Sequence, residues 1–203
     1  MTRLLLIRHG EPDEGARGRC YGRLDVGLSP TGLASAEQLA RGLRSVKLAA
    51  VYSSPRTRAL QTATALCAAP IVDARLREID FGEIEGRTYE EIERERPELY
   101  KRWMESPTLV RFPGGESYGE LRARVASCVG DAVASHAGAA IAVVAHGGVV
   151  RAALADALDL PDERAFALDV GYGRVSVVDW FGPTPIVRLI NGTTVDLPSE
   201  LGA

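Results

Sequence analysis

Residues 4–11, with the sequence LLLIRHGE, place four aliphatic residues directly before an arginine, a histidine and a glycine. A continuous aliphatic run without polar alternation is typical of a strand that is buried on both faces of a parallel sheet. Residues 140–145, AIAVVA, have the same character, and a histidine and a glycine follow them as well. The two runs predict buried central strands with polar residues at their carboxyl ends.

Further strand and helix signals alternate between these two runs. Residues 48–53 and, less regularly, 70–73 are additional candidate strands. Three serines can cap a first helical turn, because proline follows two of them and a glutamate stands three residues after the third. They are Ser29 before Pro30, Ser54 before Pro55, and Ser117 with Glu120. Another helix is expected to follow Gly147 and Gly148.

Residues 174–180, RVSVVDW, and 185–190, PIVRLI, flank a short turn and predict a terminal hairpin that finishes the sheet. Strands that alternate with helices predict an α/β fold, a three-layer α/β/α sandwich with a mostly parallel central sheet. We expect residues 1–203 to form a single domain, because the composition is even along the chain. Residues 87–110, rich in charged and aromatic side chains, are expected to form one or two short helices outside the central layer, and residues 85–112 are expected to act as a lid.

The composition is that of an ordinary globular protein, with 46% hydrophobic and 25% charged residues. No apolar run is long enough to cross a bilayer, and the first is too short for a signal peptide, so we expect a cytoplasmic protein without membrane association. The net charge of −3 argues against nucleic-acid binding through a broad basic surface. The three cysteines are widely spaced and indicate neither a disulfide framework nor a zinc site.

Polar residues follow three of the predicted strands. Arg8 and His9 follow the first, Arg58 lies just beyond residues 48–53, and His146 follows the last parallel strand. In open α/β sheets, ligands bind outside the carboxyl ends of the strands. A histidine and a glycine after one strand more often form a turn than a site. Three strand ends that bring two histidines and an arginine to one edge, however, favour a functional site.

These residue types suit a phosphate monoester. Arginine offers planar forks of donors for phosphate oxygens, and helix N-termini add amides. A neutral histidine can attack phosphorus near pH 7, and neighbouring cations favour the neutral form. The sequence contains no GxxxxGKS/T phosphate loop and no cluster of aspartates for Mg²⁺. We therefore expect a small-molecule phosphomonoester as the partner, with neither metal nor cofactor.

Six motifs stand in a fixed order between about residues 4 and 152: LLLIRHGE, LSPTG, SSPRTRALQTA, LREIDFGEIEG, PGGES and VVAHGGVVRA. Together they resemble the histidine phosphatase superfamily, also called the phosphoglycerate-mutase-like family. The resemblance implies that His9 is the nucleophile that takes the phosphoryl group and that His146 also belongs to the catalytic set. It further implies that Arg8, Arg58 and Gly147 bind the phosphate.

The resemblance also selects Glu78, in LREIDFG, as the acid that donates a proton to the leaving oxygen and later helps water to attack the phosphohistidine. The chemistry implied is ping-pong hydrolysis without a metal. From the residues alone, Glu83 and Glu85 are equal candidates for the acid.

The chain departs from the family pattern at Gly15, where many members have an asparagine that commonly contacts phosphate. Arg19, Tyr21 and the backbone amides around Gly22 are candidates to replace this contact, and a purely structural role in the loop is the alternative for each; for Arg19 both stay open. Tyr21, in the same stretch, is interpreted as loop structure.

The superfamily contains both mutases and phosphatases. Mutases usually carry an arginine and a tyrosine after the acid motif, and Ile79, Asp80 and Phe81 stand there in this chain. We therefore expect a phosphatase, most similar to the branch of α-ribazole phosphatase and broad-specificity acid phosphatases. A cofactor-dependent phosphoglycerate mutase and a catalytically idle phosphate-binding relative are the alternatives. A homodimer that pairs the terminal hairpins is compatible with the sequence but not required by it.

Overall fold

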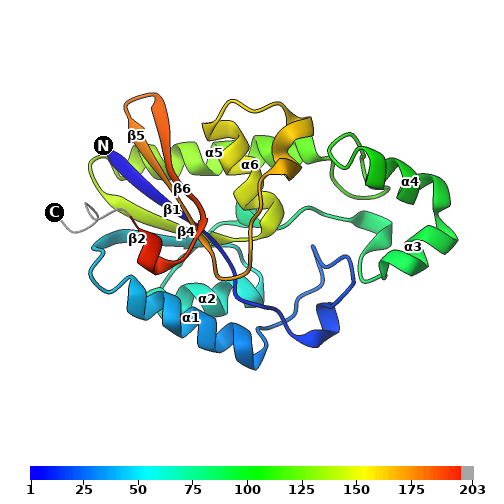
Figure 1. Cartoon of the computed structure of the whole chain (residues 1–203), viewed down its shortest axis with the longest axis horizontal. Coiled ribbons are helices and arrows are strands. Elements are labelled where there is room, and N and C mark those ends of the chain that lie inside the picture. The colour runs from blue at the N-terminus through cyan, green and yellow to red at the C-terminus, as the bar shows by residue number, and fades with distance from the viewer. Residues whose placement is uncertain (198–203) are drawn as a thin grey trace.

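The computed structural model describes residues 1–197 and is built around a sheet of six strands (Figure 1). The strands are β1 (Thr2–Arg8), β2 (Leu48–Ser53), β3 (Ile71–Val72), β4 (Ala140–Ala145), β5 (Val175–Phe181) and β6 (Thr184–Gly192), and their order is β3-β2-β4-β1-β5-β6. The first four strands of that order run parallel, whereas β5 pairs antiparallel with β1 and forms a hairpin with β6. The predicted mostly parallel sheet with a terminal hairpin is confirmed.

The register of the central strands determines where two polar residues leave the sheet. In the parallel pair of β1 and β4, Arg8 stands opposite Ala145. The next residue of each strand is a histidine, His9 after β1 and His146 after β4. Because the two strands end at the same level, the two histidines leave the sheet side by side.

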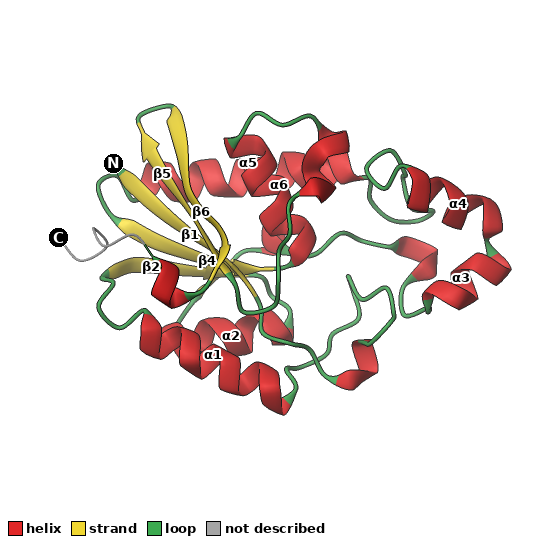
Figure 2. Cartoon of the chain, viewed as in Figure 1, coloured by secondary structure: helices red, strands yellow, loops and turns green. Residues whose placement is uncertain are grey.

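Helices cover both faces of the sheet, which confirms the three-layer α/β/α prediction (Figure 2). Helices α1 (Pro30–Gly42) and α2 (Thr57–Leu66) lie on one face, and α5 (Tyr118–Ser135) and α6 (Gly147–Ala157) lie on the other. The side chains of β1 alternate between them. Leu4 and Leu6 pack in the cluster of α5 and α6, while Leu5 and Ile7 pack in the cluster of α1 and α2. The opening aliphatic run is therefore buried on both faces, as its pattern predicts.

Two short helices, α3 (Tyr89–Glu95) and α4 (Pro97–Glu105), lie away from the sheet (Figures 1 and 2). They pack on an apolar cluster of their own, formed by Cys20, Ile84, Ile92, Leu99, Trp103, Val110 and Phe112. The prediction of short helices within residues 87–110 is confirmed, and the role of residues 85–112 as a lid stays a prediction. Five 3-10 helices complete the described secondary structure: Glu14–Ala16, Ala74–Leu76, Gly82–Ile84, Asp162–Ala167 and Thr194–Asp196.

Two of the three predicted helix starts are found. The hydroxyl of Ser29 accepts a hydrogen bond in the first turn of α1, and Pro30 is the first helical residue. Ser117 and Glu120 form a complete capping box at the start of α5. Among residues 1–197, none of the helices combines the length and the apolar character that crossing a membrane requires.

The predicted start of the next helix at Pro55 is wrong, because α2 begins two residues later at Thr57. The hydroxyl of Ser54 does not cap the helix but lies 2.8 Å from Nε2 of His146. The amide of Thr57 instead donates a hydrogen bond to the carboxylate of Asp25, 2.8 Å away. A long-range contact thus replaces the local cap that the sequence indicates.

Candidate active site

His9 lies directly beyond β1 and is buried, with an exposed fraction of 1%. Its Nδ1 is 2.7 Å from the carbonyl oxygen of Gly10. A carbonyl oxygen only accepts hydrogen bonds, so Nδ1 carries the proton and Nε2 keeps a lone pair. The ring is therefore held by one nitrogen and leaves the other available as a nucleophile.

The glycine after His9 is required by close packing of the chain. A Cβ atom at Gly10 would lie 2.6 Å from the carbonyl oxygen of Gly32 in the first turn of α1. The amide of Gly10 donates a hydrogen bond to the hydroxyl of Thr62 on α2 at 3.1 Å. Both contacts fix the loop that carries His9 against the helices on one face of the sheet.

His146 lies beside His9, with 5.1 Å between the ring centroids and the rings edge to face. Nε of Arg58 donates a hydrogen bond to Nδ1 of His146 at 3.3 Å, so this nitrogen carries the lone pair. The proton is therefore on Nε2, which donates to the hydroxyl oxygen of Ser54 at 2.8 Å. The structure brings together the two histidines that the sequence places at separate strand ends.

Both imidazoles are held in the neutral form. Burial is the main cause that lowers the pKa of His9 well below its ordinary value, and Arg58 and Arg8 lower it further although the hydrogen bond to Gly10 raises it. Burial also lowers the pKa of His146 well below its ordinary value, and the neighbouring His9 ring and the charge of Arg58 lower it further. A protonated imidazole has no free lone pair, so these surroundings keep His9 nucleophilic at neutral pH.

Arg58, in the first turn of α2, is completely buried beside His146. Its Nη1 donates to the carbonyl of Leu24 at 2.9 Å, and its Nη2 donates to the carbonyl of Tyr21 at 2.8 Å. The ring of Tyr21 also lies 4.9 Å from the guanidinium carbon. A buried guanidinium beside two neutral imidazoles gives the pocket a positive charge, which favours an anionic guest.

Arg8 supplies a second guanidinium. Its Nη1 donates to the carbonyl of Val170 at 2.6 Å, and its guanidinium carbon lies 3.8 Å from the ring centroid of Tyr172. Its Nε is buried and has no hydrogen-bond partner within residues 1–197. A Cβ atom at Gly147 would lie 3.5 Å from this nitrogen. Because an unpaired buried donor is costly, an anionic oxygen bound there would stabilise the site.

Glu78 approaches the same place from the segment that precedes α3. Its carboxylate accepts hydrogen bonds from the amides of Ile79 at 2.9 Å and of Gly148 at 3.0 Å. Gly148 belongs to the first turn of α6, which begins directly after His146. Glu83 instead forms an ion pair with the start of α4, and Glu85 accepts hydrogen bonds from amides of a neighbouring loop. Of these three carboxylates, the structure brings Glu78 to the helix that follows His146.

The sequence does not indicate Tyr172, which lies in an irregular segment far from every motif. Its ring centroid is 5.5 Å from that of His9. Its hydroxyl lies 2.6 Å from the hydroxyl of Tyr21. The two tyrosines thus link opposite sides of the site, one beside Arg8 and the other beside Arg58. No local pattern in the chain predicts this pairing.

Tyr21 in the loop after His9 differs from its sequence interpretation, whereas the sequence leaves the role of Arg19 open. Tyr21, interpreted as loop structure, contacts Arg58 with both its ring and its carbonyl and therefore belongs to the wall of the site. Arg19, considered as a replacement for the family's asparagine, donates to the carbonyl of Gly86 at 2.7 Å. Its guanidinium thus ties the loop to the outer segment. The amide of Gly15 donates to the side chain of Asp13, so that it stabilises a local turn.

A pocket of about 830 Å³ adjoins the two tyrosines. Its lining includes Tyr21, Tyr89 and Tyr172 as well as the acidic side chains of Glu11 and Asp13. In the part of the chain from 1 to 197, no group of three or more histidine, cysteine, aspartate or glutamate side chains is arranged to hold a metal ion. The residues suited to an anion are the arginines and the amides at the start of α6.

Comparison with known proteins agrees with this geometry. The family model of the histidine phosphatase superfamily (branch 1) matches residues 4–193. The chain is 34% identical to the metal-independent phosphoserine phosphatase of Arabidopsis thaliana over 159 residues, which are 75% of this chain and 67% of that protein. The structure of YhfR from Bacillus stearothermophilus is 31% identical, covers 95% of this chain and 98% of its own, and superposes with a TM-score of 0.89. The α-ribazole phosphatase from Shigella flexneri is 26% identical, with coverages of 94% and 96% and a TM-score of 0.86.

Proposed function

The chain belongs to the histidine phosphatase superfamily and is a phosphatase that acts through a histidine, and we propose that it hydrolyses small phosphomonoesters through a phosphohistidine on Nε2 of His9. One observation carries this assignment. Nδ1 of His9 is tied to the carbonyl of Gly10, so the nucleophilic nitrogen is Nε2, in a buried pocket beside His146 and two arginines.

The phosphoryl group would lie between the arginines and the start of α6. The unpaired Nε of Arg8 and the amide of Gly147 are donors for its oxygens, and Arg58 supplies charge from the opposite side. His146 is neutral, and its one N–H is already donated to Ser54, so it adds no charge beside His9 and leaves the arginines and the amide of Gly147 as the donors to the phosphoryl group. Such fixed donors stabilise the charge that develops in the transition state.

The reaction has two steps that balance without a metal or a cofactor. The lone pair of Nε2 of His9 attacks phosphorus, the P–O bond to the alcohol breaks, and protonated Glu78 gives its proton to the leaving oxygen. Water then attacks the phosphohistidine and transfers a proton to the Glu78 carboxylate, while the P–N bond breaks and its electron pair returns to Nε2. The products are an alcohol and inorganic phosphate, and Glu78 is protonated again.

Hydrolysis is favoured over mutase activity by the residues that follow the acid. Phe81 packs against Trp103 and Phe112, with ring centroids 5.7 Å and 5.0 Å away, as part of the apolar outer segment. It therefore offers no polar group to hold a phosphoglycerate. The complete set of His9, Glu78 and His146 argues against the catalytically idle alternative.

We also propose that residues 85–112 act as a lid that selects the leaving group within a single domain. Tyr89 of α3 lines the same pocket as Tyr21 and Tyr172, so that the outer segment contributes one wall. Replacing residues 85–112 with the corresponding segment of a relative should change the ranking of substrates in a phosphoester panel. An unchanged ranking would refute the lid assignment.

The proposed chemistry is tested by phosphate release from an aryl phosphate in the presence of a metal chelator. The wild-type protein should turn over, and His9→Ala should lose activity by at least about 10³-fold, because no other neutral imidazole is held for attack. His136→Ala is the matched control, since this third histidine lies at the end of α5 against Ala132 and Tyr52. Wild-type turnover in His9→Ala would eliminate the phosphohistidine mechanism.

A further inference from the structure

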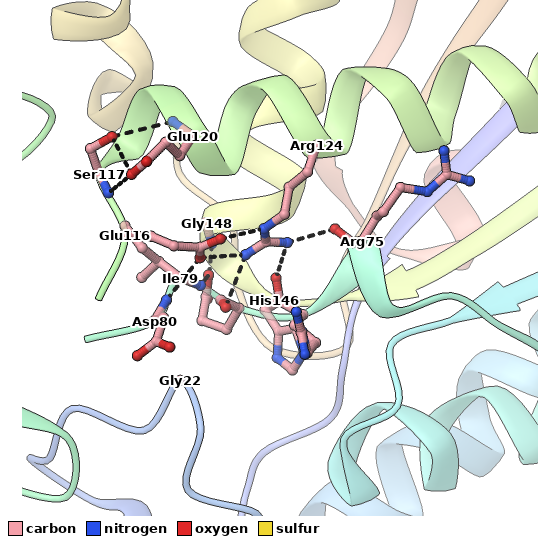
Figure 3. A network of polar contacts seen from close by, with 12 residues as sticks. Gly22, Arg75, Ile79, Asp80, Glu116, Ser117, Glu120, Arg124, His146 and Gly148 are labelled. Carbon is pink, nitrogen blue, oxygen red and sulfur yellow. Dashed lines mark hydrogen bonds and ion pairs between the residues drawn. The ribbon is translucent and has the colours of Figure 1, made fainter. Parts of the chain in front are cut away.

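The segment that carries Glu78 has no strand or α-helix of its own. After the 3-10 helix Ala74–Leu76, the chain runs irregularly until the next 3-10 helix begins at Gly82. The carbonyls and amides of such a segment need partners from elsewhere in the fold. One arginine and one glutamate near the start of α5 supply partners for four of its carbonyls and for one of its amides (Figure 3).

Arg124 of α5 uses all five of its N–H groups on this segment and on Glu116 (Figure 3). Nη1 donates to the carbonyls of Arg75 at 2.5 Å and Arg77 at 2.6 Å. Nη2 donates to the carbonyl of Glu78 at 3.1 Å and to Oε2 of Glu116 at 2.8 Å. Nε donates to Oε1 of Glu116 at 2.8 Å. The guanidinium therefore fixes three backbone carbonyls up to and including that of Glu78.

Glu116 fixes the other end of the segment. Its Oε2 accepts a hydrogen bond from the amide of Asp80 at 3.0 Å, and its own amide donates to the carbonyl of Asp80 at 2.9 Å. Burial by itself would raise the pKa of Glu116, but the hydrogen bonds and charge of Arg124 lower it below the ordinary value. Glu116 is thus an ionised partner that orients the guanidinium and holds the chain just beyond Glu78.

We propose that Arg124 and Glu116 are positioning residues for the proton donor of the reaction, an inference that rests on the proposed function. Among residues 1–197, the side-chain hydrogen bonds of Arg124 and Glu116 go to this segment and to each other, not to His9 or His146. Arg124 acts through the carbonyl of Glu78, and Glu116 acts through Arg124 and the backbone of Asp80. The carboxylate of Glu78 is anchored separately, on the amide of Gly148 at the start of α6. The backbone of Glu78 is thus held by Arg124 of α5, and its carboxylate is held by the amide of Gly148 in α6. The distance between the carboxylate and the leaving oxygen depends on both hydrogen bonds.

The geometry predicts that lysine cannot replace Arg124. A lysine has three donors on one nitrogen, against five donors in a planar fork, so at least two of the present acceptors lose their partner. The backbone of Glu78 would then relax, and a displacement of about 1 Å at a reacting group can cost about 10²-fold in rate. Glu116→Gln keeps the shape but removes the charge, so that a smaller loss in the same direction is expected.

The test compares two leaving groups. An aryl phosphate releases a stable phenolate and needs little help from a proton donor, whereas an alkyl phosphate releases an alkoxide that needs one. The value of kcat/KM reports the steps up to formation of the phosphohistidine. Arg124→Lys should lower kcat/KM for the alkyl phosphate about 10 to 100 times more than for the aryl phosphate. Glu116→Gln should change the same ratio in the same direction.

Arg122→Lys is the matched control on the same helix. Arg122 is about as buried as Arg124, with side-chain exposures of 20% and 15%, but it bonds the carbonyl of Leu160 and the carboxylate of Asp162. This variant should leave the ratio of the two kcat/KM values unchanged. Equal losses on both substrates in Arg124→Lys would show a merely structural role and overturn the proposal. Failure of the proposed function would be distinguishable, because the wild-type protein would then turn over neither substrate or His9→Ala would remain active.

Discussion

Replacing Gly148 by alanine should displace the proposed proton donor while the fold remains intact. A Cβ atom at this position would lie 2.3 Å from Oε1 of Glu78 and 3.2 Å from Cδ2 of Leu121. Ordinary contact between such atoms begins at about 3.4 Å, so the carboxylate must move by roughly 1 Å. The obstacle is the end of a flexible side chain rather than backbone, which makes this movement the least costly response.

A displacement of about 1 Å is large for catalysis and small for stability. A misplacement of this size at a reacting group can lower the rate by about 10²-fold. Alanine is favoured over glycine inside a helix by up to about 1 kcal/mol, which offsets the weakened hydrogen bond between Glu78 and the amide at position 148. We therefore expect kcat/KM for an alkyl phosphate to fall by about 10²-fold in Gly148→Ala, with a free energy of unfolding within about 1 kcal/mol of wild type.

The assays are phosphate release at subsaturating alkyl phosphate and urea unfolding followed by circular dichroism. Gly130→Ala in α5 is the matched control, because a Cβ atom there meets nothing within 4 Å. It should preserve activity and gain up to about 1 kcal/mol of stability. Wild-type kcat/KM in Gly148→Ala would refute the reasoning, since it would mean that the carboxylate of Glu78 need not stay where the structure holds it.

Three further outcomes are expected. The free energy of unfolding should decrease as the pH is lowered from about 6.5. Burial lowers the pKa of His9 and His146 in the folded protein, whereas both rings of the unfolded chain take up protons near their ordinary pKa. The stability present above pH 6.5 is therefore lost as the pH falls toward the lowered pKa values, with a slope of up to about 1.4 kcal/mol per pH unit for each ring. Urea titrations that show no slope between pH 5 and 6.5 would contradict this. Tyr172→Phe removes the hydroxyl contact with Tyr21 but keeps the ring over the arginine, so KM should rise a few-fold with kcat preserved in steady-state kinetics; an unchanged KM would mean that the hydroxyl pair does not shape the pocket. Ser117→Ala removes a helix cap and should cost about 1 kcal/mol in thermal or urea unfolding without a change in kcat/KM, and a comparable loss of activity would show that the cap also serves the site.

Much of the fold follows from local patterns. The runs at 4–7 and 140–145 become adjacent buried strands because their aliphatic side chains can be hidden on both faces. Ser29 and Ser117 cap helices because a serine hydroxyl meets the amides of the turn that follows it. Ser54 has the same local signal, yet α2 begins only at Thr57. The hydroxyl of Ser54 accepts a hydrogen bond from the amide of Arg56 in the turn before the helix and also contacts His146, 92 residues away in the sequence. The capping signal therefore locates the turn before a helix without fixing the residue at which the helix begins.

The sequence by itself determined that two histidines and an arginine would meet at one edge of the sheet. Parallel strands have their carboxyl ends at the same edge, so the residues that directly follow those strands lie there as well. The sequence did not distinguish Glu78 from its neighbours except through family resemblance, and it gave no sign of Tyr172 or of the role of Arg124. Those assignments depend on contacts such as that between Tyr21 and Tyr172, which are 151 positions apart, and that between Arg124 and the carbonyl of Glu78, which are 46 apart. Only the packing of loops and helices over the sheet brings such groups within hydrogen-bond distance, and no pattern of neighbouring residues encodes that geometry.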